Sequence, residues 1–347
     1  MLAKITGMTC SRVFPLLALP AVFAVSAGAQ TWSIRSSGID TNLRGVSAPG
    51  DGHEGTVWVS GSNGVVMVTS DMGKRWKRLR VEGGEDLDFR GVVAFNESKA
   101  YLMSSGEGAK SRIYKTTDGG ASWRLEYSDE RKEFFLDALE CLSETDCYAL
   151  GDPLDGRFVI LHTRDGERWE RLPSAGMPQA LQQEGAFAAS NSCLQVDASR
   201  GLYFVTGGGS ARMFHSADFG RTWSVRGLPL LKGNASSGAF SIAVKGGNIV
   251  VTGGDYRSAA ESRDSAAYSR DGGDTWRRAA EPPGGFRSAV ATADGRRLVA
   301  VGTNGSDSSD DHGQHWKPID SGSWNALTVS KSGAWAVGAK GTVARFE

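Results

Sequence analysis

The sequence has no excess of either charge, little proline and no hydrophobic run long enough to span a membrane as a helix. Its 347 residues carry 39 Lys and Arg against 39 Asp and Glu, which argues against nucleic acid as a partner. Proline is scarce at 10 residues, whereas glycine is abundant at 46. Most of the glycine lies in short turn-like clusters between alternating apolar segments, which favours antiparallel strands over helices.

The longest apolar run, residues 13–25, is shorter than the roughly 20 residues that a membrane span needs. Lys4 and Arg12 precede this run, and the small-x-small sequence Ala27-Gly28-Ala29 follows it. This arrangement predicts a secretory signal peptide over residues 1–29 that is cleaved after Ala29. We therefore expect a periplasmic or secreted chain, residues 30–347, without a stable membrane span.

Cysteine is also scarce, and three of the four cysteines follow the predicted signal peptide. Cys141 and Cys147 flank a polar segment between two apolar ones, so they could face each other across a hairpin. In an oxidising compartment this spacing predicts a disulfide, with two buried thiols as the alternative. We expect Cys193 to be a buried, small apolar residue.

A repeated turn motif is the strongest signal in the sequence. The pattern Ser/Thr-x-Asp-x-Gly-x-x-Trp occurs five times, and a sixth copy at residues 163–169 is one residue short. The Asp and Trp residues of the six copies are Asp71, Trp76, Asp118, Trp123, Asp165, Trp169, Asp218, Trp223, Asp271, Trp276, Asp311 and Trp316. Each copy follows a strand-like segment, which indicates an internal repeat.

The residues of this motif suit a tight turn. The Asp carboxylate can accept hydrogen bonds from backbone N–H groups of the turn, and the Gly two positions later can adopt a positive φ. The Ser or Thr hydroxyl adds a local bond to the backbone, and the Trp covers the hairpin with a large apolar surface. We therefore predict a structural role for these residues and no catalytic residue among them.

Each repeat contains four extended segments, with the motif as the turn between the third and the fourth. After the sixth motif the chain supplies three more such segments and ends, while residues 31–35 near the N-terminus match the missing fourth. Seven units in residues 30–347 average about 45 residues, the usual size of a propeller blade. We predict an all-β, seven-bladed β-propeller with four antiparallel strands per blade, closed by the N-terminal strand completing the last blade.

The six motifs resemble the Asp-box, or bacterial neuraminidase (BNR), repeat. Residues 31–346 resemble the photosystem II stability/assembly factor-like family of exported seven-bladed propellers, and residues 299–305 and 335–343 add to the match. The resemblance implies a non-catalytic protein that binds a protein or peptide and helps to assemble or stabilise a complex. Its partner would be a membrane-protein assembly intermediate, and we expect the propeller itself to be a monomer.

Polar side chains are predicted to gather at the mouth of the central channel, on the face opposite the Asp-box turns. They come from the starts of the inner strands and from the loops between the second and third strands of the blades. The predicted binding residues are Arg44, Arg90, Asp137, Asp152, Glu184, Arg212, Asp255, Tyr256, Arg287, Asp307 and Asn325. The arginines could pair with carboxylates of an acidic peptide while the acidic residues orient it. An ordinary hydrated surface is the alternative.

The Asp-boxes also suggest a second function, that of a sialidase-like glycoside hydrolase. Resemblance to those enzymes implies an arginine triad, an Asp acid and a Tyr activated by Glu, for which Tyr256 and the nearby Glu261 are candidates. The sequence lacks the Phe/Tyr-Arg-Ile-Pro segment that normally supplies the first arginine. Seven blades in place of six are a further departure, so the hydrolase is kept as the alternative function.

Neither a cofactor nor a metal ion is predicted. The sequence contains no Gly-x-Ser-x-Gly elbow, no phosphate-binding Gly-x-x-x-x-Gly-Lys-Ser/Thr loop and no dinucleotide-binding fingerprint in a strand–helix context. His312 and His315 lie inside the sixth Asp-box, and their spacing offers no third zinc ligand. Asp307, Asp310 and Asp311 lack the ordered ligand loop of a dedicated calcium site.

Overall fold

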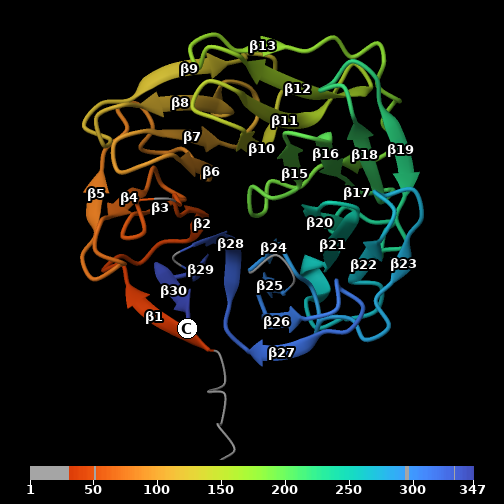
Figure 1. The fold of residues 1–347 in the computed structure, drawn as a ribbon. Coiled ribbons are helices and arrows are strands. Elements are labelled where there is room, and N and C mark those ends of the chain that lie inside the picture. Colours follow the sequence, from red (N-terminus) through yellow and green to blue (C-terminus); the bar gives the residue numbers. More distant parts are fainter. Residues whose placement is uncertain (1–30, 51, 294–296, 332) are drawn as a thin grey trace, which may run out of the picture.

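A ring of seven antiparallel sheets surrounds a central channel (Figure 1). The structure is a computed structural model that describes residues 31–50, 52–293, 297–331 and 333–347. The predicted signal peptide lies outside the described residues. Among the described residues, no helix has the length and apolar character of a membrane span.

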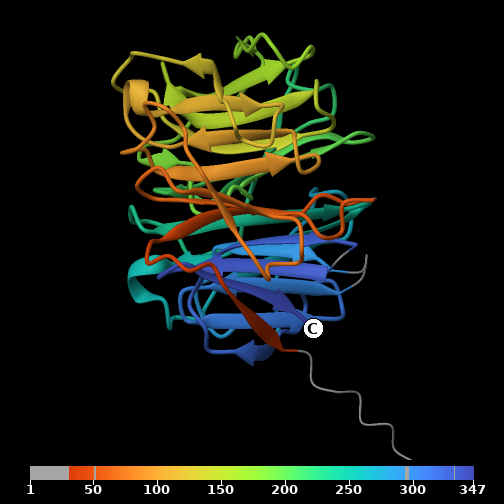
Figure 2. The same ribbon diagram turned by 90° about the vertical axis from the view of Figure 1, so that its left-hand side faces the viewer.

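In every blade the strands follow one another from the channel outward, as the repeat predicts. In the first three blades they are β2 (Leu43–Ser47), β3 (Val57–Gly61), β4 (Val66–Thr69) and β5 (Lys77–Leu79); β6 (Phe89–Ala94), β7 (Ala100–Ser104), β8 (Arg112–Thr116) and β9 (Arg124–Ser128); and β10 (Leu136–Cys141), β11 (Cys147–Leu154), β12 (Arg157–Thr163) and β13 (Glu170–Arg171). Figure 2 shows the ring from the side, with turns at both of its faces.

The next three blades repeat this order. Their strands are β15 (Leu194–Asp197), β16 (Gly201–Val205), β18 (Arg212–Ser216) and β19 (Ser224–Gly227); β20 (Ser237–Lys245), β21 (Asn248–Asp255), β22 (Ala266–Ser269) and β23 (Arg277–Arg278); and β24 (Ala289–Thr292), β25 (Leu298–Gly302), β26 (Gly305–Ser309) and β27 (Lys317–Asp320). Short 3₁₀ turns, η1 (Gly108–Lys110) and η2 (Tyr256–Ser258), lie between the second and third strands of blades 2 and 5.

The seventh blade joins the two ends of the described chain. Its inner strands are β28 (Trp324–Ser330), β29 (Gly333–Gly338) and β30 (Thr342–Phe346), and its outer strand is β1 (Trp32–Ser36), which pairs antiparallel with β30. The Trp32 ring lies 5.3 Å from that of Trp324 and 5.0 Å from that of Phe346. The prediction of a seven-bladed propeller with four-stranded blades is confirmed.

The hydrophobic core is divided among the contacts between neighbouring blades. Between blades 1 and 2, for example, Trp58 and Val66 pack with Phe89 and Leu102, all of them buried. Such a core explains why the strands are rich in apolar residues on both faces: each sheet has a neighbour on either side. It also explains why the exposed large apolar residues include Ile34 and Leu125, which lie on outer strands.

The connection between blades 3 and 4 departs from the predicted repeat. The sequence analysis placed Glu184 at the start of an inner strand, but the inner strand of blade 4 is β15, which begins at Leu194. Glu184 lies instead in β14 (Glu184–Gly185), which pairs with β17 (Gly207–Gly208) and so extends the sheet of blade 5 to six strands. Residues 184–190 have the composition of an inner strand, so the local pattern misplaced the blade start.

The cysteines are arranged as the sequence suggested. Cys141 and Cys147 form a disulfide between the end of β10 and the start of β11, where they are directly opposite each other in the ladder. Cys193 is a buried free thiol next to β15.

Candidate functional site: the channel mouth and the opposite face

One face of the ring carries the Asp-box turns, which we call the box face. In the second box, the Thr116 hydroxyl donates to the Asp118 carboxylate at 2.8 Å and accepts from the backbone N–H of Gly120 at 2.9 Å. The same carboxylate accepts from the backbone N–H and the hydroxyl of Ser122 at 2.9 and 2.6 Å. These bonds, led by the Ser122 hydroxyl, lower the pKa of Asp118 to about 2. The hydrogen bonds of the Asp118 carboxylate are therefore made within its own turn.

The box glycine has a second role that the sequence analysis did not include. Gly120 has φ +75°, as expected, but a Cβ there would also lie 2.5 Å from Leu79 of blade 1. Likewise, a Cβ at Gly273 would lie 2.5 Å from Met213 of blade 4, and one at Gly313 would lie 2.9 Å from Val250 of blade 5. The turn thus packs so closely against the preceding blade that a side chain at the glycine would have to displace a neighbouring apolar side chain.

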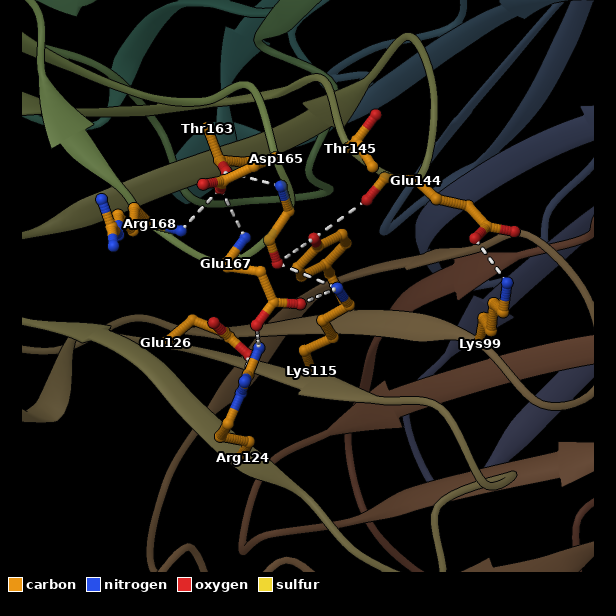
Figure 3. Close-up of polar contacts among 12 residues, drawn as sticks. Lys99, Lys115, Arg124, Glu126, Glu144, Thr145, Thr163, Asp165, Glu167 and Arg168 are labelled. Carbon is orange, nitrogen blue, oxygen red and sulfur yellow. Dashed lines mark hydrogen bonds and ion pairs between the residues drawn. The ribbon is translucent and has the colours of Figure 1, made fainter.

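The shortened box of blade 3 shows how such a turn also holds a neighbour by polar contacts (Figure 3). Asp165 accepts from the backbone N–H groups of Glu167 and Arg168 at 2.8 and 2.9 Å. The carbonyl of Gly166 accepts from the Tyr101 hydroxyl and from Lys115 Nζ of blade 2, both at 2.9 Å. Loss of one residue therefore leaves the turn chemistry intact.

We call the opposite face the mouth face. The inner strands carry β-bulges near this face. The ladder between the inner strand and its neighbour shifts register by one residue in five blades. The residues skipped by these bulges are Arg44, Arg90, Asp137, Phe240 and Asn325. A bulge turns a side chain out of the regular alternation, and here all five line one cavity of about 510 Å³.

This cavity at the channel mouth collects six of the predicted binding residues. They are Arg44, Arg90, Asp137, Asp152, Tyr256 and Asn325, and they are joined by Phe135, Phe187, Phe240 and Phe286. The aromatic residues were not predicted, because only polar residues were expected at the mouth. The pattern apolar–x–small–apolar around each bulge, as in Leu43-Arg44-Gly45-Val46 and Ala239-Phe240-Ser241-Ile242, is a signal that could have found Phe240.

Two arginines form the basic side of the mouth cavity. Arg90 donates to Asp88 at 2.7 Å and to the carbonyl of Ala188 at 2.9 Å. Arg44 is largely buried, and its Nε has no hydrogen-bond partner among the described residues. Burial, followed by repulsion from Arg90, lowers the pKa of Arg44 to about 10. A negatively charged ligand would relieve both effects, because it would supply a partner and an opposite charge.

Two carboxylates form the acidic side. Asp137 is 1% exposed, and neither of its oxygens has a hydrogen-bond partner among the described residues. Burial and the nearby Asp152 raise the pKa of Asp137 well above its usual value. Asp152 accepts from the backbone N–H of Ala186 at 2.9 Å, and burial raises its pKa to about 6. The basic and acidic sides are thus both incompletely paired.

The remaining predicted residues are used within the protein. Arg287 is buried and donates through Nε to Asp307 at 2.6 Å, and it also bonds Asn304 at 2.7 Å. Arg212 pairs with the buried Glu184, its Nε lying 2.8 Å from Oε1.

Asp255 caps η2 by accepting from the N–H of Arg257 at 2.9 Å. None of the five residues Glu184, Arg212, Asp255, Arg287 and Asp307 lines the mouth cavity. Partners within the protein explain this: Arg212 and Arg287 form ion pairs with Glu184 and Asp307, and Asp255 accepts hydrogen bonds from nearby loop residues.

A chain segment closes the inner end of the mouth cavity. The segment between β14 and β15 reaches into the centre of the ring (Figure 1). There the Ser190 hydroxyl donates to the carbonyl of Ser288 at 2.6 Å, and Asn191 exchanges bonds of 2.8 Å with the backbone of Leu139. Beyond this segment lies a second cavity of about 360 Å³, lined by the far halves of the inner strands. Glu140 faces it, and burial raises the pKa of Glu140 to about 7.

Fold and repeats together define a seven-bladed β-propeller with Asp-box turns. The family model described as photosynthesis system II assembly factor YCF48 matches residues 18–129. The photosystem II assembly lipoprotein Ycf48 of Synechococcus sp. (strain CC9902) is 33% identical over 104 residues, which span 29% of this chain and 29% of that protein. The chloroplastic photosystem II stability/assembly factor HCF136 of Arabidopsis thaliana is 25% identical over 317 residues, 85% of this chain and 72% of that protein.

Solved structures agree in fold. A YCF48 bound to a D1 peptide has a TM-score of 0.64 at 17% identity, covering 91% of this chain and 96% of its own. YCF48 from Cyanidioschyzon merolae has a TM-score of 0.66 at 15% identity, covering 91% of this chain and 99% of its own. The resemblance of this chain to the photosystem II stability/assembly factor-like family is confirmed.

Proposed function

We propose that this chain is an exported, non-catalytic propeller that binds a protein or peptide at the mouth cavity and helps to assemble or stabilise a membrane-protein complex. The observation that carries the proposal is Arg44, an arginine whose buried Nε has no partner among the described residues and which lines a cavity at the channel mouth. Buried guanidinium N–H groups normally have hydrogen-bond partners, so an unpartnered Nε in a cavity favours an anionic ligand.

The relatives support a peptide as that ligand. A YCF48 of the same fold is bound to a D1 peptide, and two curated relatives are named as photosystem II assembly factors. One of these is named a lipoprotein and the other is named chloroplastic, which supports the proposal of export. The proposed partner is D1 or, in a host without D1, a membrane protein with an equivalent role in its own complex.

A direct test is titration of the purified protein with a D1 peptide. We expect Arg44→Gln to weaken binding by about 10- to 150-fold, since a hydrogen bond to a charged group contributes about 1.5–3 kcal/mol. The variant should not lose stability, because burial and Arg90 already oppose the charge on Arg44. Arg75→Gln is the matched control, since Arg75 is an exposed box-face arginine paired with Asp71. Equal loss in both variants would contradict the proposal.

A second test identifies the client. A photo-cross-linking amino acid replaces Tyr256, which is 44% exposed at the mouth, or Leu125, which is 47% exposed on the outer strand β9. In the envelope fraction of the native host, we expect a discrete adduct from position 256 that is absent from position 125. The same adducts from both positions would argue against recognition at the mouth.

The hydrolase alternative is not favoured by the surroundings of Tyr256. Its ring packs against Phe240 and Phe286, at centroid distances of 6.2 and 6.4 Å, as part of an aromatic wall. We expect no turnover of a fluorogenic sialoside by the purified protein. Measurable turnover that is lost in Tyr256→Phe would instead support the hydrolase function.

A further inference from the structure

The acidic side of the mouth cavity lacks a counter-charge. Asp137, on blade 3, is buried with both oxygens unpartnered among the described residues. Asp152 lies on the adjacent strand and is a source of repulsion for it. Two bulges bring these carboxylates together, since the β10–β11 and β11–β12 ladders skip residues 137 and 152 respectively. The fold therefore places two carboxyl groups on one wall.

Neighbouring cations do not neutralise this wall. Arg90 attracts Asp137, but its side chain is held by Asp88 at 2.7 Å and by the carbonyl of Ala188. Asp152 accepts a hydrogen bond at Oδ1 from the backbone N–H of Ala186 at 2.9 Å, which brings no positive charge. A ligand cation would give both carboxylates the opposite charge that they lack.

The rest of the cavity is suited to a cation with an apolar stem. Phe187 and Phe240 stack at 3.9 Å between centroids, and Phe286 meets Phe240 edge-on at 4.7 Å. Aromatic rings attract ammonium groups and bury the methylenes that carry them. A bare metal ion fits less well, because the described part of the chain holds no group of three His, Cys, Asp or Glu side chains that could bind one.

We propose that the mouth cavity binds a primary ammonium group on an aliphatic stem, such as a lysine side chain, between Asp137, Asp152 and the aromatic wall. This inference rests on the proposed function and deepens it, because it adds a cationic residue to the peptide whose carboxylate would meet Arg44. The ligand would then be a segment carrying both charges, and neither an acidic nor a basic segment alone would use the whole cavity.

Butylammonium chloride is the probe, titrated calorimetrically into the full chain at neutral pH and constant ionic strength. We expect saturable binding that Asp137→Asn and Asp152→Asn each weaken by about tenfold. Asp274→Asn is the control, since Asp274 is 74% exposed on the box face and should leave the affinity unchanged. Affinity that is the same in all three variants and the parent would overturn the inference.

Butyrate, which has the same stem with the opposite charge, separates this inference from the proposed function. Butyrate binding that Arg44→Gln abolishes, with no butylammonium binding, would overturn the inference and leave the proposed function standing. Butylammonium binding without butyrate or D1-peptide binding would support the inference alone. Should an Asp variant fail to fold, NMR of the parent decides: nuclear Overhauser contacts between the butyl chain and aromatic protons support the site, and their absence overturns it.

Discussion

Asp118 on the box face and Asp137 on the mouth face are carboxylates with opposite surroundings. Asp118 accepts hydrogen bonds from its own turn, and its pKa falls to about 2. Asp137 is buried without a partner among the described residues, and its pKa rises. The box face repeats one self-sufficient turn, whereas the mouth face places a different residue at each bulge. The residues that repeat from blade to blade stabilise the ring. The residues that differ from blade to blade, those at the bulges, are available to a ligand.

The largest expected effect is the loss of a box tryptophan. Trp316 is 4% exposed in the contact between blades 5 and 6, and its Nε1 donates to the carbonyl of Gly313 at 3.1 Å. We expect Trp316→Ala to lower the free energy of unfolding by about 3–5 kcal/mol in urea denaturation. Trp316→Phe, which keeps an aromatic ring, should lose less. If Trp316→Ala lowered the free energy of unfolding no more than Arg44→Gln does, the box face would not be more important for stability than the mouth face.

The disulfide of the box face has the next largest effect. Cys141 and Cys147 join β10 to β11 at the end of the hairpin that carries Asp137 at its other end. We expect the double variant Cys141→Ser/Cys147→Ser to lose about 2 kcal/mol of unfolding free energy, because the cross-link restricts the unfolded chain. Binding of the D1 peptide should persist in that variant at temperatures where it stays folded. Equal stability of reduced and oxidised parent protein would count against this estimate.

Exchange of Asp for Asn should have opposite signs on the two faces. Asp118→Asn should destabilise the protein, and the parent should lose the contribution of Asp118 as the pH falls from about 4 towards 2. Asp137 has a raised folded-state pKa, so its contribution is present below about pH 4 and is lost as the pH rises. Asp137→Asn should thus be more stable than the parent at pH 8, by about 1 kcal/mol or more. Urea titrations at several pH values measure the unfolding free energy of both variants. If both substitutions changed it in the same direction at pH 8, the contrast between the two faces would be contradicted.

The smallest effect is expected inside the channel. Burial raises the pKa of Glu140 to about 7, so the parent should lose stability as the pH rises from about 4.5 to 7. Glu140→Gln should lack this loss and exceed the parent by about 1 kcal/mol above pH 7, a value reduced by partial exposure to channel water. Parallel stability curves for the two proteins from pH 4 to 8 would show that folding does not raise the pKa of Glu140.

Local chemistry that recurs along the chain made the ring predictable. The Asp-box residues, the strand lengths and the unpaired segment near Trp32 all depend on contacts within one blade or on a simple count of blades. Of the mouth residues, Arg44, Arg90, Asp137 and Asn325 were identified because each lies at an inner-strand start. Phe240 was not predicted, because only polar residues were expected to line the mouth.

Contacts between segments that are distant in the chain could not be predicted from the sequence. Arg212 and Arg287 are of the same residue type as Arg44, yet each is paired with a buried carboxylate from a different strand. The segment that crosses the channel imitates an inner strand and was taken for one. Hydrogen-bonded turns and alternating strands follow from neighbours in the chain, so composition and spacing were enough to define the architecture. Which charges remain unpaired follows from packing across the ring, because the partners of Arg212 and Arg287 come from segments 28 and 20 residues away in sequence.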